Sequence, residues 1–377
     1  MKRIHFGLLA TLFVCAVVLV SCGDDDDNGT VSQPRVVTIT FSDASATVEI
    51  PSSLASEVSA EVSGAYVTIT NNGVGDETEF ILSGSTSDGG FTYNGQYKTT
   101  LRLKDVNITS QQGAALNIQC GKRIALVLEN GTENTLADFA SGTQKACLYC
   151  KGHLEIAGAG TLNVAGNLSH AIKSKEYLQL KKTVGTINIT SAEGDAINVG
   201  QYFLQQGGEV NITNTTKGDG VQVEMLTLDD DTTPDPDKEN NGKVFIQGGK
   251  LNIVAANMDK KAIKADEMVT ISGGELTLVA SGAGSRGIQT DTDVLINEES
   301  GTTSINISVT GGPCTDPDDS DDPHRAMGIK ADGDVTINAG TVTVTATGSK
   351  ARTIRALTYT VADNATVTTN RNPKIGE

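Results

Sequence analysis

The sequence predicts an all-β protein, a parallel β-helix with three short strands in each turn, about 24–25 residues per turn and about nine or more turns. The segment Gly248–Ser272 is followed without a gap by Gly273–Asn297, in which glycine pairs, apolar positions and one aspartate recur in register. A fixed period of this length is typical of stacked repeats that bury their apolar faces against one another. The 41 glycines, 4% aromatic residues and absence of tryptophan suit many short strands and tight turns.

Residues 1–21 are predicted to be a signal peptide, because Lys2 and Arg3 precede an apolar run from Phe6 to Val20. This run is too short for a comfortable membrane span. The residues before Cys22 resemble the lipobox of bacterial lipoproteins, which implies cleavage before Cys22 and its acylation. The expected location is therefore the outer membrane, with outer-membrane lipid as a partner.

Residues 22–35 are predicted to be the lipidated cysteine and an acidic linker. The run GDDDDN directly after Cys22 resembles the acidic export tag of surface lipoproteins, which favours cell-surface exposure. A short charge run is also compatible with an ordinary solvated linker.

Residues 36–85 are predicted to form N-terminal strands that start the stack or cap it. Alternation is weak here, with expected strands at 36–41, 47–50, 66–70 and 80–82. A stack has an open first edge that must be covered.

Residues 86–365 are predicted to be the β-helix itself, followed by a C-terminal tail at 366–377. One apolar residue in each repeat serves as a marker, and these markers are expected to form a common inner row. They are Leu116, Leu148, Ile172, Ile197, Val221, Ile263, Ile288, Ile329 and Ile354. Two Asp- and Pro-rich insertions, 229–242 and 311–324, interrupt the period and are expected to flank one face of the stack.

Recurring polar and small residues predict two further columns. Asparagines in the third strand should stack one above another and hydrogen-bond along the axis, or else present a polar face to a sugar. These are Asn163, Asn188, Asn211, Asn252 and Asn306. Glycines are expected at the corners with positive φ, namely Gly160, Gly185, Gly208, Gly249 and Gly274.

Acidic residues also recur at fixed offsets from the markers. Two residues before the marker stand Asp195 and Asp219, and three residues after it stand Glu224, Asp266, Asp291 and Asp332. Stacked like charges repel unless a cation intervenes, so calcium, which accepts several oxygen ligands, is the expected cofactor. The alternative is neutralisation by basic residues one position after the marker, such as Lys173, Lys264, Lys330 and Arg355.

Candidate carbohydrate-binding residues are the aromatic side chains Tyr177 and Tyr202 and the basic side chains Lys173, Lys264 and Lys330. Together with His153, the tyrosines stand five residues after successive markers. An outward aromatic column can stack on sugar rings, or it can be ordinary corner packing.

The remaining composition excludes several classes. The net charge is −17 and there is no long basic block, so a nucleic-acid partner is not expected. Cys147 and Cys150 have CxxC spacing, but no second pair completes a zinc set. We expect Cys120, Cys147, Cys150 and Cys314 to be packed or disulfide-bonded, and the protein to be a monomer.

Several stretches in order resemble the bacterial carbohydrate-binding β-helix family whose members resemble pectate lyases in fold. They are Ile81–Gly84, Thr99–Ile108, Gly131–Leu136, Lys145–Asn167, His170–Ser174 and Gly218–Glu224. The resemblance implies a right-handed β-helix with calcium bound along it. It also implies non-catalytic binding of polysaccharide, either acidic pectic chains or cellulose.

By position, Asp195 and Asp219 match the acidic residue of the family's DGI-like repeat. Lys261, Arg286 and Met327 replace that acid in later turns.

Two other functions stay open. A polysaccharide lyase needs a base beside calcium, and Lys264 or Lys330 among Asp266, Asp291 and Asp332 could supply that arrangement. A structural or adhesion protein of the cell surface would need only the stack and the anchor.

Overall fold

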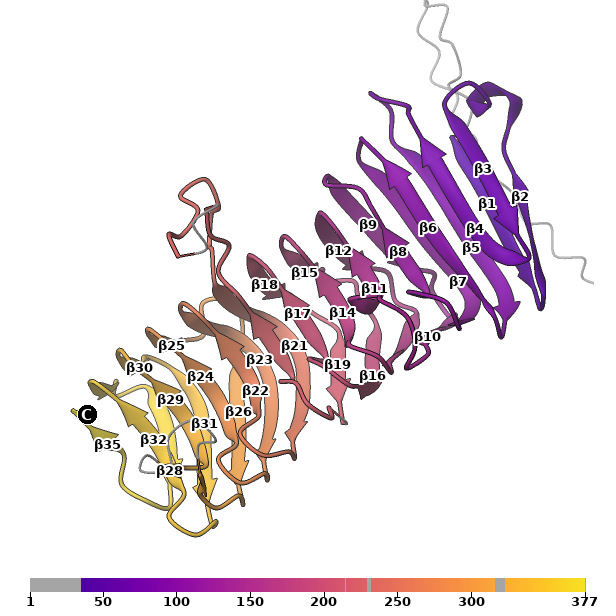
Figure 1. Cartoon of the computed structure of the whole chain (residues 1–377). Coiled ribbons are helices and arrows are strands. Elements are labelled where there is room, and N and C mark those ends of the chain that lie inside the picture. Colours follow the sequence, from indigo (N-terminus) through magenta and orange to yellow (C-terminus); the bar gives the residue numbers. More distant parts are fainter. Residues whose placement is uncertain (1–34, 214, 229–231, 316–322, 377) are drawn as a thin grey trace, which may run out of the picture. The chain divides into compact units, whose positions relative to one another are not determined.

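The computed structural model describes residues 35–213, 215–228, 232–315 and 323–376, and its regular structure there is almost entirely β-strand. Helix in this part is limited to the short turn η1 (Ser52–Leu54). No helix of the described chain is therefore both long and apolar enough to cross a membrane. Parallel strands lie one above another along the chain, as Figure 1 shows. The all-β prediction is confirmed.

Within the described residues, thirteen strands form a sheet that contains all the marker residues, and we call it the marker sheet. Its strands are β3 (Val58–Ser63), β4 (Ala65–Asn71), β6 (Gly89–Gly95), β8 (Leu116–Ile118), β11 (Ala146–Cys150), β14 (His170–Ser174), β17 (Ile197–Val199), β20 (Val221–Val223), β22 (Lys261–Ala265), β24 (Arg286–Thr290), β29 (Met327–Ala331), β32 (Arg352–Ala356) and β35 (Lys374–Ile375).

The other large sheet contains two series of strands, which long strands join. The first series is β1 (Val36–Ser42), β5 (Thr78–Thr86), β7 (Thr99–Ser110), β9 (Arg123–Leu128), β12 (His153–Ala157), β15 (Leu178–Leu180), β18 (Tyr202–Gln205), β21 (Lys243–Ala255), β23 (Val269–Ala280), β25 (Val294–Ile296), β30 (Val335–Ile337) and β33 (Tyr359–Val361). The second series pairs with the later halves of the long strands β7, β21 and β23, which therefore belong to both series. Its other strands are β10 (Glu133–Asp138), β13 (Thr161–Gly166), β16 (Thr186–Ala192), β19 (Glu209–Ile212), β26 (Thr303–Val309), β31 (Gly340–Ala346) and β34 (Ala365–Thr369).

The pairing repeats from one turn of the sequence to the next. Strands β11, β12 and β13 pair in parallel with β14, β15 and β16, in that order. The handedness of the winding stays a prediction.

The markers form one inner row, as expected. Each is paired with the next, from Leu116 with Leu148 through to Ile329 with Ile354. All nine side chains are buried. The row also extends backward to Phe91 and Val67, where the sequence pattern was too weak to be counted.

Both ends of the chain add to the stack. At the N-terminal end, β2 (Ser45–Glu49) and β3 pair antiparallel with β1 and β4, so this region both begins the stack and covers its edge. At the other end, the segment expected to be a tail contributes most of β34 and all of β35. Val367 pairs with Val342 and packs against the core, although the surrounding threonines hide this pattern in the sequence.

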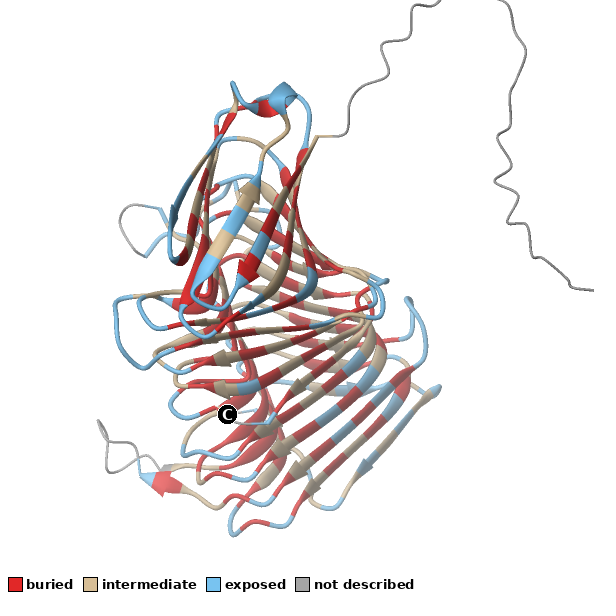
Figure 2. Cartoon of the chain, turned by 90° about the vertical axis from the view of Figure 1, so that its right-hand side faces the viewer, coloured by how far each residue is buried: buried red, intermediate tan, exposed pale blue. Residues whose placement is uncertain are grey.

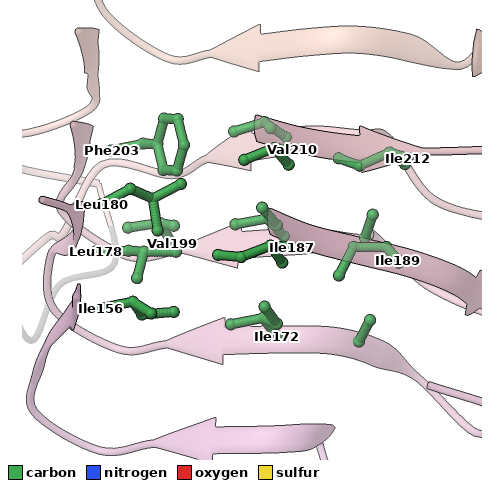
Figure 3. Packing of buried hydrophobic residues seen from close by; sticks show 14 of the residues in the cluster. Ile156, Ile172, Leu178, Leu180, Ile187, Ile189, Val199, Phe203, Val210 and Ile212 are labelled. Atoms are coloured by element: carbon green, nitrogen blue, oxygen red, sulfur yellow. The ribbon is translucent and has the colours of Figure 1, made fainter. Parts of the chain in front are cut away.

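Alternation places every second side chain in the core, which gives the banded burial pattern of Figure 2. Inside, like positions pack on like positions in successive turns. Leu178 lies between Leu154 and Phe203 in the paired strands, and Ile156 is paired with Leu180. Figure 3 shows these apolar side chains in layers between the strands.

Outward asparagines form the predicted amide ladder. Asn188 donates to Asn163 at 2.9 Å, Asn211 to Asn188 at 3.0 Å, and Asn252 to Asn211 at 2.8 Å. The column continues through Thr277, Asn306 and Thr343 by strand pairing. Most amides of this column therefore serve the stack rather than a ligand.

The predicted corner positions require glycine for two different reasons. Gly208, Gly249 and Gly274 have φ of 73°, 82° and 97°, as expected for corners. Gly160 and Gly185 do not have positive φ; a Cβ there would lie 2.4 Å and 2.3 Å from backbone oxygens of the preceding turn. At these two positions close backbone approach, rather than left-handed conformation, requires glycine.

The insertions leave the marker sheet at opposite strand ends. The first lies between β20 and β21; there Lys238 forms an ion pair with Glu176 at 2.8 Å, and Gln201 donates to the carbonyl of Glu239 at 2.9 Å. The second precedes β29 and contains the small hairpin of β27 (Cys314–Thr315) and β28 (Pro323–His324). Residues 229–231 and 316–322 lie outside the described residues.

The marker row should dominate stability. We expect Ile263→Ala to lower the free energy of unfolding by about 2–5 kcal/mol, because it leaves a cavity between two packed turns. Its neighbour Lys264 points outward, so Lys264→Ala should change stability by less than about 0.5 kcal/mol. Urea unfolding followed by circular dichroism measures both values, and equal losses would contradict the inner-row assignment.

Candidate functional site

The outward face of the marker sheet carries a continuous polar column, one residue after each marker. Strand pairing places its members in register, turn by turn. They are Thr92, Asn117, Tyr149, Lys173, Asn198, Gln222, Lys264, Gln289, Lys330 and Arg355. Its C-terminal half is rich in positive charge.

A cavity of about 600 Å³ opens over this C-terminal half, and we call it the basic cleft. Among the described residues, its charged lining consists of seven basic residues and two acids, apart from His324. The bases are Lys261, Lys264, Arg286, Arg325, Lys330, Arg352 and Arg355, and the acids are Asp259 and Asp332. The cleft is therefore strongly positive in a chain whose net charge is −17.

The two acids hold part of this positive charge in place. Asp332 Oδ1 lies 2.9 Å from Lys330 Nζ and 3.3 Å from Arg355 Nη1. Asp259 pairs with Lys261 at 3.1 Å and with Arg286 at 3.3 Å. Each acid serves two bases, and Lys264 and Arg325 stand outside these ion pairs, so the lining formed by the described residues is positive overall. Guanidinium groups match carboxylates by paired hydrogen bonds, so the cleft suits a carboxylate-bearing molecule.

The sequence predicted Lys264 and Lys330 as carbohydrate-binding residues, whereas it predicted Asp332 as a metal ligand and Arg355 as a neutralising base, and it gave the other cleft residues no binding role. Lys261, Arg286 and Arg352 stand two residues before the marker, in a column next to that of Lys264 and Lys330. The repeat alone places these two basic columns next to each other, so the sequence could have predicted a basic surface here. Asp259, His324 and Arg325 lie on connecting segments, which no periodicity places.

The predicted metal ligands Asp195 and Asp219 are buried and already serve the backbone. Asp195 Oδ1 accepts the N–H of Asp219 at 2.8 Å, and Asp219 Oδ1 accepts the N–H of Lys261 at 2.7 Å. Asn198 donates to the other oxygen of Asp195 at 2.8 Å. Each carboxylate therefore fixes the start of the next marker strand, which leaves its oxygens less available to a calcium ion.

The pKa values of these two acids move in opposite directions. Burial raises the pKa of Asp195, but contacts with His170, the Asp219 N–H and Asn198 outweigh it, so its pKa lies below the usual value. Burial is also the main influence on Asp219, and its pKa is raised despite the nearby Lys261. The negative charge of Asp195 adds to that rise.

The four acids three residues after the marker lie at the strand ends of the same sheet. Asp266 accepts the Met225 N–H at 2.9 Å, and exposed Glu224 accepts from Gln222 at 2.8 Å. Asp332 is neutralised by Lys330 and Arg355, which was the alternative interpretation. Burial raises the pKa of Asp291, and the charges of Asp266 and Asp332 contribute to that rise. Asp266 and Asp291 directly follow the paired residues Ala265 and Thr290, so these two acids lie at adjacent strand ends.

The aromatic column exists, but its rings cover one another. Tyr177 stacks on His153 with ring centroids 4.4 Å apart and on Tyr202 with centroids 5.0 Å apart. The Tyr177 hydroxyl contacts Glu155 at 3.2 Å, and Gln179 donates to the Tyr202 hydroxyl at 2.6 Å. Both faces of Tyr177 are occupied, so this geometry favours corner packing over sugar stacking.

Lys173, another predicted carbohydrate-binding residue, donates to Asn198 and lies outside the basic cleft.

Asp259, Cys314 and His324 form a mixed cluster with ligating atoms within 4.8 Å of one another. The carboxylate of Asp259 is already paired with Lys261 and Arg286, and these positive charges oppose a divalent cation. Cys120, Cys147, Cys150 and Cys314 are all free and buried. Cys22 lies outside the described residues.

Comparison with known proteins agrees with this architecture. A family model described as "Carbohydrate-binding domain-containing protein" matches residues 63–368, so the chain belongs to that family. A protein of the same description from Acetivibrio thermocellus is 28% identical over 138 residues, which is 34% of this chain and 46% of the relative. The matched region thus spans about half of that relative.

The fold is also similar to a solved structure described as the polysaccharide lyase-like protein from C. thermocellum, gadolinium derivative. The TM-score is 0.57 at 22% identity, over 70% of this chain and 98% of the other. This likeness concerns the fold.

Asp195 should make the fold sensitive to acid. Because its folded-state pKa is lowered, its stabilisation is present above the unfolded pKa of about 3.9 and is lost as pH falls through the folded value. We expect Asp195→Asn to cost about 1.5–3 kcal/mol near neutral pH, and less in acid. Urea unfolding across this pH range measures the difference. If the stability cost of Asp195→Asn did not change with pH, this role of Asp195 would be contradicted. The same pH dependence of stability in the exposed control Glu224→Gln would also contradict it.

Proposed function

We propose that this protein binds an anionic polysaccharide in the basic cleft and does not cleave it. The supporting observation is the concentration of seven bases around about 600 Å³ of a chain with net charge −17. Uronic acid chains, such as pectic chains, carry carboxylates that this lining can pair. A neutral chain such as cellulose would gain less from the guanidinium groups of the cleft, because its hydroxyl groups accept weaker hydrogen bonds than carboxylates do.

Binding without cleavage is favoured by the state of the candidate bases. An eliminating lyase needs a group that accepts a proton. Lys330 is held in an ion pair with Asp332, which suits a cation that binds a carboxylate. The family description as carbohydrate-binding points the same way. The lyase alternative keeps Lys264 as its candidate base.

Two variants test the cleft with little disturbance of the fold. Lys264 and Arg325 line it without belonging to the ion pairs around Asp259 and Asp332. We expect Lys264→Ala and Arg325→Ala each to weaken binding of a galacturonate oligosaccharide about tenfold, because each removes one charge-assisted hydrogen bond. Isothermal titration measures the affinity, which should also fall as salt rises.

Lys182→Ala is the matched control, since Lys182 is exposed on the turn between β15 and β16, away from the cleft. Equal losses in the control and cleft variants would contradict the proposal. Absence of binding to any glycan would favour the structural or adhesion alternative. If the wild type formed unsaturated, ultraviolet-absorbing products from the polysaccharide and Lys264→Ala did not, the lyase alternative would be favoured.

We further propose calcium as a cofactor, at Asp266 and Asp291. These acids lie on adjacent turns, and their charges act on each other. Calcium takes six to eight oxygen ligands, so water, backbone or sugar oxygens would complete its shell. When bound, it supplies positive charge that can join protein acids to ligand carboxylates.

Calcium should raise the unfolding midpoint, with a stabilisation of about 2.7 kcal/mol at a free concentration one hundred times its dissociation constant. Asp291→Asn should abolish this rise, yet be no less stable than wild type in chelator, because it relieves the repulsion from Asp266 and Asp332. Asp363→Asn, at an exposed acid of the last turn, should respond to calcium like wild type. Thermal unfolding with calcium and with chelator distinguishes these outcomes, and an undiminished response of Asp291→Asn would contradict the site.

We also propose a location at the outer membrane, exposed to the cell surface through acylated Cys22. The leader and the residues before Cys22 support this proposal. A monomer anchored there would hold polysaccharide close to the cell.

A further inference from the structure

The N-terminal half of the marker sheet face carries two other cavities, of about 610 and 400 Å³. Gln119 lines both of them. The smaller cavity lies over Asn117 and Tyr149, which belong to the same outward column as Lys264 and Lys330. We call the surface formed by Asn117, Gln119, Gln144 and Tyr149 the amide site.

The chemistry of the amide site differs from that of the basic cleft. Of the residues that the structure describes, no acid lines either cavity. The lysines that do, Lys122, Lys145 and Lys151, are all exposed to solvent, which screens their charge. Side-chain amides both donate and accept hydrogen bonds, whereas guanidinium and ammonium groups only donate. Within the amide site Gln119 donates to Asn117 Oδ1 at 2.6 Å, and Gln144 donates to Asp138 at 3.1 Å. The remaining amide groups match the hydroxyl groups of an uncharged sugar, which also donate and accept.

Tyr149 supplies the aromatic surface that the other column lacks. It is half-buried, it stands between Asn117 and Lys173 in the sheet, and it lines the smaller cavity. Among the described residues it makes no ring–ring contact, unlike Tyr177 and Tyr202. An unstacked ring beside amides is suited to the apolar face of a sugar ring.

We propose that the amide site is a second sugar subsite, which binds uncharged sugar rings of the same polymer whose carboxylates occupy the basic cleft. This inference rests on the proposed function. Six strand steps separate Tyr149 from Lys330, or about 29 Å at about 4.8 Å per step. A chain lying along the stack axis reaches both sites, and a short oligosaccharide reaches only one.

The test compares two probes, trigalacturonate and a partly methyl-esterified galacturonan long enough to span both sites. We expect Tyr149→Ala to weaken binding of the long probe about tenfold and to leave trigalacturonate unchanged, since the second contact acts only within one chain. Tyr149→Phe keeps the ring and should bind the long probe like wild type. The salt dependence should be unchanged in Tyr149→Ala and reduced in Lys264→Ala.

Three results would overturn the inference: wild-type affinity of Tyr149→Ala for the long probe, an equal loss in Tyr149→Phe, or an equal loss for trigalacturonate. Matching circular dichroism and unfolding midpoints establish that the variants fold. Failure of the proposed function has a different signature, because the wild type itself would then bind neither probe.

Discussion

The structure depends on in-register parallel pairing of identical positions in successive repeats. Each marker packs on the marker of the next turn, from Leu116 to Ile354, and the side chains of the marker strands are thereby placed above their counterparts. A slip of one residue would turn the apolar set outward. Because the register is fixed along the stack, residues at the same position of successive repeats form one column. An outward column is a strip of the protein surface with its own chemistry.

The strips differ in how they satisfy their polar groups. The asparagine strip is largely self-sufficient, since Asn188, Asn211 and Asn252 each donate to the asparagine of the preceding turn. The strip two residues before the markers changes from acid to base: Asp195 and Asp219 hold the backbone N–H groups of the next turn, and Lys261 and Arg286 follow them. Buried charges are tolerated there because each has a partner. The basic cleft begins where this strip becomes basic.

The sequence period was sufficient to predict the marker row and the amide ladder, because both follow from backbone repetition alone. It could not show that the rings of His153, Tyr177 and Tyr202 cover one another, since that depends on side-chain rotamers. Nor could it show that Asp195 and Asp219 bind backbone N–H groups instead of presenting free oxygens. The cleft combines two columns with residues from connecting segments, such as Asp259 and Arg325, whose position no period fixes.

Charge is distributed unevenly along the face of the marker sheet. An acidic protein repels a polyanion over most of its surface, so a basic cleft favours one place where such a chain can bind. The acids at the strand ends, Asp266 and Asp291, border the cleft beside Lys264 and Lys330. Without a cation they repel a carboxylate from that border, and a bound cation would reverse the effect. At the other end of the face, the proposed amide site would impose no such condition on charge, so a polymer with both charged and uncharged stretches would place a charged stretch over the basic cleft.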